Sequence, residues 1–307
     1  MKKKPEFHGS DLEKIADYYH LNKENIVLFG ANVNPLGLSG QVKKELAAHL
    51  DVISSYPDRN YTDLKNAIAS YTDTSAEHIV VGNGSTELIS LLISQRAPKK
   101  ALLLGPTYSE YARELNLVGG TLEYYNLKEE QDFRLDISDL TDALKSDIDL
   151  LIICNPNNPT GYLYTRKEMN QMRDLVKKYD LFLFSDEVYR EFCYTGAPYI
   201  SAFHLKGIEN NIVLIDSVSK RYSECGIRVG ALLCKNEKVR ENVMKMCQAR
   251  LSPPLIGQII AEASLDAPAD YILDVYNEYV ERRKFLIDGL NKIPGCYSPI
   301  PMGAFYT

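Results

Sequence analysis

The sequence predicts an α/β protein whose core is a mostly parallel sheet. Six short apolar runs have the character of strands that are buried on both faces. Those runs are His78–Val81, Ala101–Leu104, Leu150–Cys154, Leu181–Phe184, Asn211–Ile215 and Gly230–Leu233. Segments of helical period, such as Lys167–Tyr179, lie between most of them. Because strands that alternate with helices form parallel sheets with helical crossovers, this order favours an open α/β sheet.

The chain is long enough for more than one packed unit. It has 307 residues, of which 45% are hydrophobic and 25% are charged, so it can bury a sizeable core. We expect three parts: an N-terminal arm that contributes to a small domain, a large domain, and an interdomain helix followed by the start of a C-terminal small domain. Their bounds are residues 1–45, 46–275 and 276–307. Apolar residues recur with helical spacing through Tyr271–Ile293, which predicts the long helix.

Charge and composition exclude several classes of protein. The net charge is −6 and the only basic cluster is Lys2–Lys4, so no surface that would bind nucleic acid is expected. No stretch approaches the roughly 18 apolar residues of a membrane span, and the expected location is cytoplasmic. The six cysteines lie far apart without a C-x-x-C pair, which predicts buried, reduced thiols rather than a metal site or a disulfide framework.

In an open α/β sheet the ligand binds at the carboxyl ends of the strands, so the residues that follow each strand matter. The stretch "GNGSTE", Gly82–Glu87, follows the first strand and precedes an expected helix, Leu88–Ser94. Free N–H groups and the hydroxyls of Ser85 and Thr86 at a helix N-terminus would suit a phosphate. A plain helix N-cap would explain the same residues. The stretch is not a dinucleotide fingerprint, because Glu87 replaces the third glycine.

Four further strand ends carry polar or aromatic residues. Tyr108 in "GPTYSEY" could stack on a flat ring or belong to the core. The stretch "NPNNPTG", Asn155–Gly161, forms a rigid turn. Asp186 in "SDEVY" follows an apolar run, so its carboxylate would be partly buried and need a partner, unless it only caps the next segment. Lys220 in "SVSK" stands where the next strand would open into a loop, where a lysine is usually an exposed cation.

Taken together, these five strand ends describe a site for pyridoxal 5'-phosphate (PLP). The chemistry of PLP needs a lysine amine for a Schiff base, a carboxylate for the pyridinium nitrogen, and an aromatic side chain to stack on the ring. It also needs cations and hydroxyls for the phosphate. Arg228, eight residues after Lys220, would bind that phosphate bidentately.

With these motifs in this order, the chain resembles a fold-type I PLP enzyme of the class I/II aminotransferases. The motifs are "NPNNPTG", "SDEVY", "SVSK" with an arginine eight residues after the lysine, and "PMGAFY" near the end. The resemblance covers essentially the whole chain, and the combined motifs are far more specific than any one of them. It implies a large domain with a mostly parallel central sheet and a small α/β domain that is incomplete in this sequence.

The resemblance also implies roles for individual residues. Lys220 would form the Schiff base and shuttle protons, and Asp186 would pair with the pyridine nitrogen. Tyr189 and Asn158 would hydrogen-bond to the ring oxygen, and Tyr108 would stack on the ring. Five residues would hold the phosphate: Gly84, Ser85, Thr86, Ser217 and Arg228.

Substrate and partner expectations follow from the same resemblance. Family members are usually homodimers whose sites borrow a tyrosine from the neighbouring subunit. Tyr56 in "YPDRNY" stands where that residue is expected, and Tyr61 is the alternative. Asn34, Gly37 and Asn158 are the candidate substrate contacts. The expected partners are a small amino acid and a 2-oxo acid, with no nucleic acid, membrane or metal.

The end of the sequence departs from the family pattern. Family members normally run well beyond "GAFY", and the further stretch usually carries the arginine that holds the substrate's α-carboxylate. This chain stops at Thr307, so we expect either a fragment or a small domain that is completed elsewhere. Arg250 in "QARLSPP" is an arginine in the right region, but the expectation for it is a solvated cation at a helix end.

The motifs divide between two branches of the family. "FHGSDLEKIA" and "LFGANVNPLG" resemble threonine-phosphate decarboxylase and histidinol-phosphate aminotransferase, whereas "SVSKRYSECGIRVG", "QARLSPP" and "PMGAFY" resemble the aspartate aminotransferase branch. Because the half that holds Lys220 favours that branch, we expect transamination between an aspartate-, aromatic- or histidinol-phosphate-like L-amino acid and a 2-oxo acid such as 2-oxoglutarate. The alternatives are a threonine-phosphate decarboxylase-like lyase and a catalytically weak cofactor-binding fragment.

Overall fold

The computed structural model describes residues 11–27, 32–144, 147–267 and 269–307. Contacts within the chain divide it into two compact units, residues 1–33 and 34–307. The first unit contains helix α1, Leu12–Tyr19, and the short 3-10 helix η1, Lys23–Asn25. Lys2–Lys4 and parts of two motifs, residues 7–10 and 28–31, lie outside the described residues.

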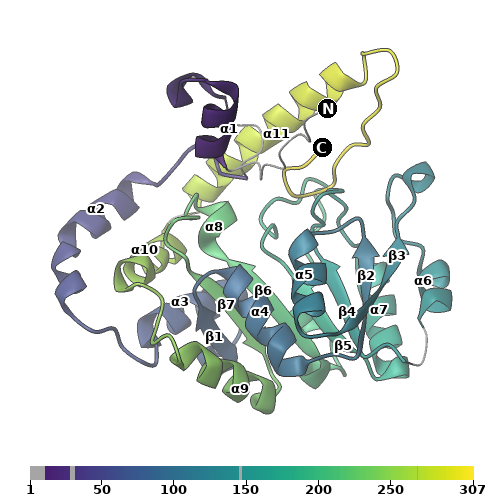
Figure 1. Ribbon diagram of the computed structural model, residues 1–307, viewed down its shortest axis with the longest axis horizontal. Helices are drawn as coiled ribbons and strands as arrows, with labels where there is room; N and C mark the ends of the chain where they lie inside the picture. Colours follow the sequence, from purple (N-terminus) through teal and green to yellow (C-terminus); the bar gives the residue numbers. More distant parts are fainter. Residues whose placement is uncertain (1–10, 28–31, 145–146, 268) are drawn as a thin grey trace. The chain divides into compact units, whose positions relative to one another are not determined.

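The second unit is built on a seven-stranded sheet with the order β1-β7-β6-β5-β4-β2-β3 (Figure 1). Neighbouring strands from β6 across to β3 are parallel, and β7 is antiparallel to both β1 and β6. The strands are β1 (Ile79–Gly82), β2 (Lys100–Gly105), β3 (Thr121–Asn126), β4 (Leu150–Cys154), β5 (Phe182–Asp186), β6 (Ile212–Ser217) and β7 (Gly230–Cys234). The predicted mostly parallel α/β sheet is confirmed.

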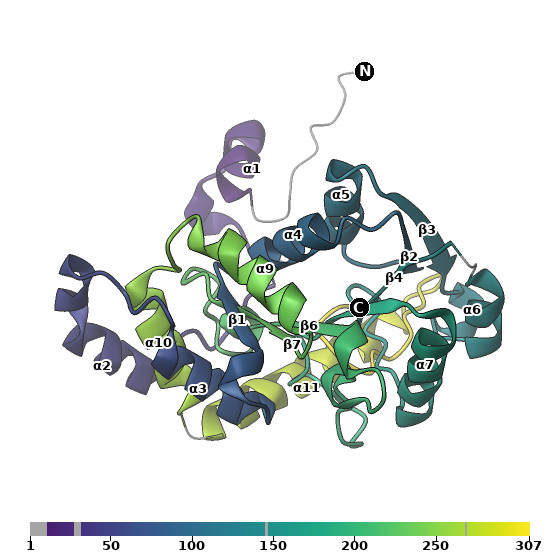
Figure 2. The ribbon, with the colours of Figure 1, turned by 90° about the horizontal axis from the view of Figure 1, so that it is seen from below.

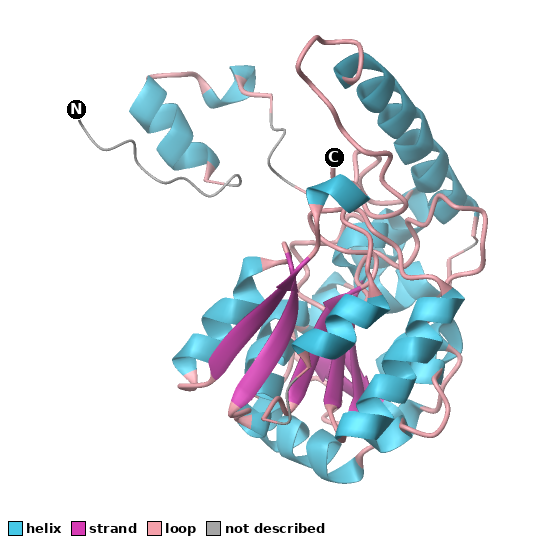
Figure 3. Ribbon diagram, turned by 90° about the vertical axis from the view of Figure 1, so that its right-hand side faces the viewer, coloured by secondary structure: helices cyan, strands magenta, loops and turns pink. Residues whose placement is uncertain are grey.

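Helices flank the sheet, and many loops gather at one end of its strands (Figure 3). The α-helices of this unit are α2 (Gly40–Ala48), α3 (Thr62–Thr72), α4 (Ser85–Arg96), α5 (Ser109–Leu117), α6 (Ile137–Ala143), α7 (Arg166–Tyr179), α8 (Val218–Arg221), α9 (Glu237–Gln248), α10 (Leu255–Leu265) and α11 (Asp270–Leu290). The 3-10 helices are η2 (Leu50–Ser54), η3 (Ala76–His78), η4 (Glu129–Gln131), η5 (Ala202–His204) and η6 (Glu209–Asn211). Figure 2 shows α4 and α9 side by side, and these two helices pack against each other.

Alternate residues of the central strands enter different hydrophobic clusters. Leu151 and Ile153 of β4 pack in a cluster with α6 and α7. Ile152 of β4 and Phe184 of β5 pack in another cluster with α4, α5 and α9. Because successive side chains of a strand point to opposite faces, both faces of the sheet are buried. This burial explains why the strands appear in the sequence as continuous apolar runs.

Helix α7 shows how local sequence sets the bounds of an element. Its N-cap Thr165 accepts a hydrogen bond from the Glu168 N–H at 3.3 Å, and the Glu168 carboxylate accepts one from the Thr165 N–H at 2.7 Å. This reciprocal pair is a capping box. Asp180, with a left-handed φ of 51°, ends the helix. The predicted helix Lys167–Tyr179 is therefore confirmed to within one residue.

One strand and one cysteine differ from the expectations. Strand β3 was not predicted, because it lies at the sheet edge and most of its residues are exposed or half-buried, so no apolar run marks it. The prediction of buried thiols is wrong for Cys296, which is exposed, whereas Cys154, Cys234 and Cys247 are buried. In the described part of the chain, no helix is long and apolar enough to cross a membrane, and no His, Cys, Asp or Glu cluster could hold a metal ion.

The predicted domain bounds, residues 1–45, 46–275 and 276–307, stay a prediction.

Candidate active site

Strands β5 and β6 are parallel neighbours whose carboxyl ends carry two of the predicted catalytic residues. Asp186 is the last residue of β5 and pairs with Ile215 of β6. Lys220 lies on α8, which begins directly after β6. The expectation of a loop at Lys220 is wrong, because Ser217 caps a short helix there by accepting a hydrogen bond from the Ser219 N–H at 3.1 Å.

The carboxylate of Asp186 is buried and held by two hydrogen bonds. The Tyr111 hydroxyl donates to Oδ2 at 2.7 Å, and the Val188 N–H donates to Oδ1 at 3.3 Å. Burial raises the pKa of Asp186 to about 6, although the hydrogen bond from Tyr111 opposes that shift. A cation placed beside this carboxylate would favour its ionised form.

Tyr111 was not identified from the sequence. It is fully buried on α5, three residues after Tyr108, and the two rings meet edge to face with centroids 5.5 Å apart. Side chains three residues apart lie on the same face of a helix. The sequence signal that could have identified Tyr111 was the position of Tyr108 at the start of a helix. A residue one turn later on that helix lies on the same face as Tyr108.

The amine of Lys220 is half-buried near several of the predicted site residues. Its Nζ lies 6.0 Å from the centroid of the Tyr189 ring. Burial lowers the pKa of Lys220, with Cys225 and Asp186 opposing this shift and Arg228 adding to it. A lowered pKa increases the share of the neutral amine, which is the nucleophilic form.

The turn between β1 and α4 lies against the side chain of Arg228. Helix α4 begins at Ser85, and Gly84 before it has a φ of 85°. A Cβ on Gly84 would lie 2.1 Å from Arg228 Nη2, so only glycine lets the guanidinium approach this backbone. Arg228 Nη1 donates to the Cys225 carbonyl oxygen at 2.9 Å. A fixed cation beside a helix N-terminus, together with the hydroxyls of Ser85 and Thr86, suits a phosphate.

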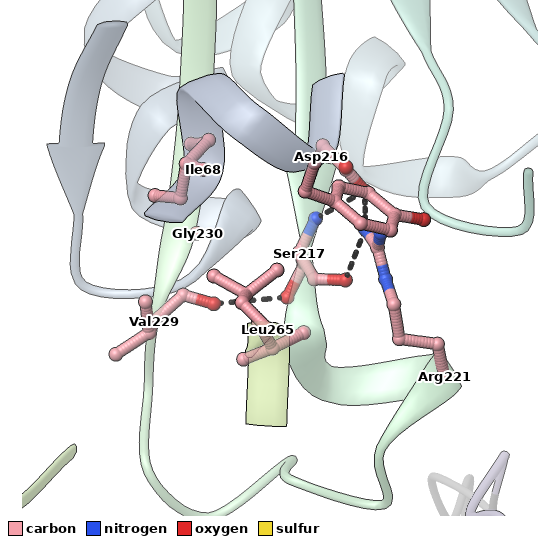
Figure 4. Close-up of a pocket in the computed structure, with 10 residues that line it drawn as sticks. Ile68, Asp216, Ser217, Arg221, Val229, Gly230 and Leu265 are labelled. Atoms are coloured by element: carbon pink, nitrogen blue, oxygen red, sulfur yellow. Dashed lines mark hydrogen bonds and ion pairs between the residues drawn. The ribbon is translucent and has the colours of Figure 1, made fainter. Parts of the chain in front are cut away.

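Ser217, the remaining predicted phosphate ligand, lies beside a small cavity (Figure 4). Its hydroxyl donates to the Val229 carbonyl oxygen at 3.1 Å. Asp216 forms an ion pair with Arg221, which is 1% exposed and which the sequence did not single out. The cavity measures about 20 Å³, which is room for roughly one water molecule. A cofactor would therefore have to lie outside this cavity.

Three further predicted residues lie on loops or helix ends that follow strands. Tyr108 directly precedes α5 and is half-buried. Tyr189 is buried, and its hydroxyl shares a hydrogen bond with that of Tyr306. Asn158 is half-buried in the turn after β4, where Asn157 donates to the Pro106 carbonyl oxygen at 3.0 Å. That bond ties the turn after β4 to the turn after β2.

The predicted substrate residues Asn34 and Gly37 form a turn whose polar groups are already bonded. Asn34 is buried, and its Nδ2 donates to the Arg221 carbonyl oxygen at 3.1 Å and to the Tyr271 hydroxyl at 3.0 Å. Its Oδ1 accepts from the Leu36 N–H at 2.9 Å. The Gly37 carbonyl oxygen accepts from the Tyr271 hydroxyl. Because both Nδ2 hydrogens are donated within the protein, a substrate group that accepts from Asn34 would have to replace one of these bonds. The substrate contact of Asn34 stays a prediction.

The two tyrosines of "YPDRNY" differ sharply in burial. Tyr56 is 90% exposed, whereas Tyr61 is 1% exposed. The Tyr61 hydroxyl donates to the Leu251 carbonyl oxygen at 2.8 Å. Tyr61 is therefore a core residue, which leaves Tyr56 as the candidate for a contribution to a neighbouring subunit.

The expectation that Arg250 is a solvated cation is wrong. Its Nε and Nη2 donate to the two carboxylate oxygens of Glu87, each at 2.6 Å, and both side chains are 23% exposed. The two residues are 163 positions apart, so no local pattern in the sequence indicated the pair. Because Glu87 occupies its guanidinium, Arg250 is also a poor candidate for holding a substrate carboxylate.

The residues present fit PLP. Any side chain at residue 84 would clash with the Arg228 guanidinium, so glycine at this position lets the cation lie beside the start of α4, where the phosphate of PLP would bind. The ring nitrogen of PLP matches the buried carboxylate of Asp186, and its aldehyde matches the half-buried amine of Lys220. These groups come from β1, β5, β6 and the residues that follow them.

Residues 24–307 match the model of the family described as aminotransferase class I and II. The chain belongs to this family. Class I/II aminotransferase family enzymes depend on PLP, so the family and the site geometry point to the same cofactor.

Relatives of this class I/II family member differ in their named reactions. This chain is 33% identical over 264 residues to threonine-phosphate decarboxylase of Salmonella typhimurium, and the match covers 85% of this chain and 71% of that protein. It is 26% identical over 288 residues to histidinol-phosphate aminotransferase of Methanococcus aeolicus, covering 92% of this chain and 75% of that protein. Aspartate aminotransferase from Thermus thermophilus, solved with maleate, has the same fold, with a TM-score of 0.87 and 20% identity over 98% of this chain and 81% of that one.

Proposed function

We propose that this chain is a PLP-dependent aminotransferase that moves an amino group between an L-amino acid and a 2-oxo acid such as 2-oxoglutarate. Family membership and the similarity to a histidinol-phosphate aminotransferase support this reaction. The observation that carries the proposal is the arrangement of Asp186 and Lys220 at the carboxyl ends of the adjacent strands β5 and β6, with Arg228 beside the start of α4.

Asp186 would stabilise the protonated ring nitrogen of PLP. When bound, PLP supplies an electron sink for the bond that breaks at the substrate Cα. The Tyr111 hydroxyl orients the carboxylate by its hydrogen bond to Oδ2 at 2.7 Å. Burial without a cation costs this carboxylate free energy, so a positive ring nitrogen beside it would be favoured.

Lys220 would attach the cofactor and then accept the proton from the substrate Cα at its Nζ. Its lowered pKa supports this role, because burial favours the neutral amine that can take up a proton. Tyr189 and Asn158 would bind the ring oxygen, and Tyr108 would stack on the ring. The phosphate would be held by Gly84, Ser85, Thr86, Ser217 and Arg228.

A second candidate function is decarboxylation of the threonine-phosphate type. The 33% identity to the Salmonella typhimurium decarboxylase favours it. The two reactions differ in which bond at Cα lies perpendicular to the cofactor ring. We favour transamination because the segment around Lys220 resembles the aspartate aminotransferase branch.

A homodimer is part of the proposal. Tyr56 is 90% exposed although it is aromatic, as expected for a side chain that enters the site of a second copy. The small-molecule partners would be the amino acid and the 2-oxo acid.

Covalent attachment at Lys220 is the first test of this function. After incubation with PLP and reduction with borohydride, peptide mapping should find the pyridoxyl group on Lys220, and Lys220→Ala should bind PLP without covalent labelling. Labelling of another lysine, such as Lys235, would refute the assignment. A change in the cofactor absorbance on addition of an amino acid would distinguish an enzyme from a protein that only binds the cofactor.

Activity assays of the wild-type protein discriminate between transamination and decarboxylation. Amino transfer from aspartate, glutamate or an aromatic amino acid to 2-oxoglutarate is the expected result. Release of carbon dioxide from threonine phosphate without amino transfer would favour the decarboxylase instead.

A further inference from the structure

Glu87 places a negative charge at the proposed phosphate site. It lies in the first turn of α4, and its Oε2 accepts a hydrogen bond from the Asn83 N–H at 2.5 Å. Asn83 precedes Gly84, the residue against which the Arg228 guanidinium lies. A carboxylate here would repel a phosphate at the same helix N-terminus and would attract Arg228.

Arg250 neutralises this carboxylate. Its Nε and Nη2 form two parallel bonds to Glu87, each 2.6 Å long, and Nη2 also lies 3.4 Å from the Val81 carbonyl oxygen. Burial alone would raise the pKa of Glu87, but the hydrogen bonds from Arg250 and Asn83 outweigh burial and lower it. Glu87 is therefore ionised at neutral pH, and Arg250 is the cation that pairs with it.

The arginine is itself held in place. Arg250 follows α9, which packs against α4. The next residue, Leu251, has a left-handed φ of 73°, and its carbonyl oxygen accepts the 2.8 Å hydrogen bond from the buried Tyr61. These contacts fix the backbone that presents the guanidinium to Glu87.

We propose that Arg250 is a positioning residue for the cofactor phosphate. By binding both carboxylate oxygens of Glu87 it prevents that carboxylate from pairing with Arg228, whose guanidinium then binds the phosphate. The inference deepens the proposed function and rests on it, since the phosphate concerned is that of PLP. Arg250 therefore supports binding of the cofactor phosphate and does not bind the substrate carboxylate.

Comparison of PLP with pyridoxal, which lacks the phosphate, tests this inference. The Kd of each is measured by titrating the cofactor-free protein. Arg250→Gln should raise the Kd for PLP about 10-fold or more, because Glu87 then competes for Arg228, and should change the Kd for pyridoxal less than about 2-fold. A matched control is Arg240→Gln, since Arg240 lies on α9 but donates to the Cys234 carbonyl oxygen at 2.9 Å. The control should leave both Kd values unchanged.

Removal of the competing charge should rescue the variant. In the double variant Glu87→Gln/Arg250→Gln, the Kd for PLP should return to within about 3-fold of the wild-type value, because glutamine still accepts the Asn83 N–H but carries no charge. Glu87→Gln alone should not raise the Kd for PLP. This single variant keeps the inference testable if Arg250→Gln does not fold.

Three results would overturn the inference. They are an equal loss of PLP and pyridoxal binding in Arg250→Gln, a double variant no better than Arg250→Gln, and a 10-fold rise in the PLP Kd of Glu87→Gln. Each would show that the pair supports the fold and not the phosphate site. Wild-type protein that fails to attach PLP at Lys220 would instead refute the proposed function itself, and this inference with it.

Discussion

Gly84→Ala is the sharpest test of the phosphate site, because its comparison with a matched glycine variant separates backbone strain from the loss of a ligand. Gly84 has φ 85° and ψ 167°, a region that is essentially open to glycine alone. An added Cβ would lie 2.1 Å from Nη2 and 2.7 Å from Cζ of Arg228. The substitution therefore strains the turn and also displaces the guanidinium.

Each effect has its own expected size. The backbone strain should lower the free energy of unfolding by about 1 to 3 kcal/mol. A displaced Arg228 loses hydrogen bonds to a charged group that are worth about 1.5 to 3 kcal/mol. That loss corresponds to a Kd for PLP that is roughly 10- to 100-fold higher.

Gly207→Ala is the matched control. Gly207 has a φ of 86°, nearly that of Gly84, but nothing lies within 4 Å of the position of its missing Cβ. Both variants should lose stability in urea unfolding of the cofactor-free protein, and only Gly84→Ala should lose affinity in PLP titrations. If Gly84→Ala bound PLP as tightly as Gly207→Ala does, the assignment of Arg228 to the phosphate would be refuted.

Two further predictions concern buried carboxylates. Asp186→Asn should still attach PLP at Lys220 but lower kcat about 100- to 1000-fold, because it removes a charge partner of the transition state; near-normal kcat would exclude a role at the ring nitrogen. Glu224 is 1% exposed and accepts from the Ser264 hydroxyl, and burial raises its pKa to about 8 from 4.5. Because the pKa of Glu224 is higher in the folded protein than in the unfolded chain, its contribution to the free energy of unfolding is fully present below pH 4.5. That contribution is lost as the pH rises through the folded value of about 8. In urea unfolding, Glu224→Gln should thus be about 5 kcal/mol more stable than wild type above roughly pH 9 and no more stable below roughly pH 4, and equal stability at high pH would contradict this.

Local sequence was enough to predict six of the seven strands and the residue types at their ends. The runs around Leu150–Cys154 and Gly230–Leu233 are apolar because helices cover both faces of the sheet, so burial leaves a direct mark on the sequence. Lys220 and Asp186 could be picked out because each follows such a run within five residues. Their roles at the cofactor stay predictions until they are measured.

Tertiary structure alone decided which distant side chains support the site. Tyr111 reaches the Asp186 carboxylate across 75 positions, and Arg250 reaches Glu87 across 163. The spacing of residues along the chain carries periodicity within one helix or strand, but it carries no record of which elements pack together. An arginine after a helix therefore has the same local pattern whether it is solvated or paired, and only the packing of α9 against α4 makes Arg250 the partner of Glu87.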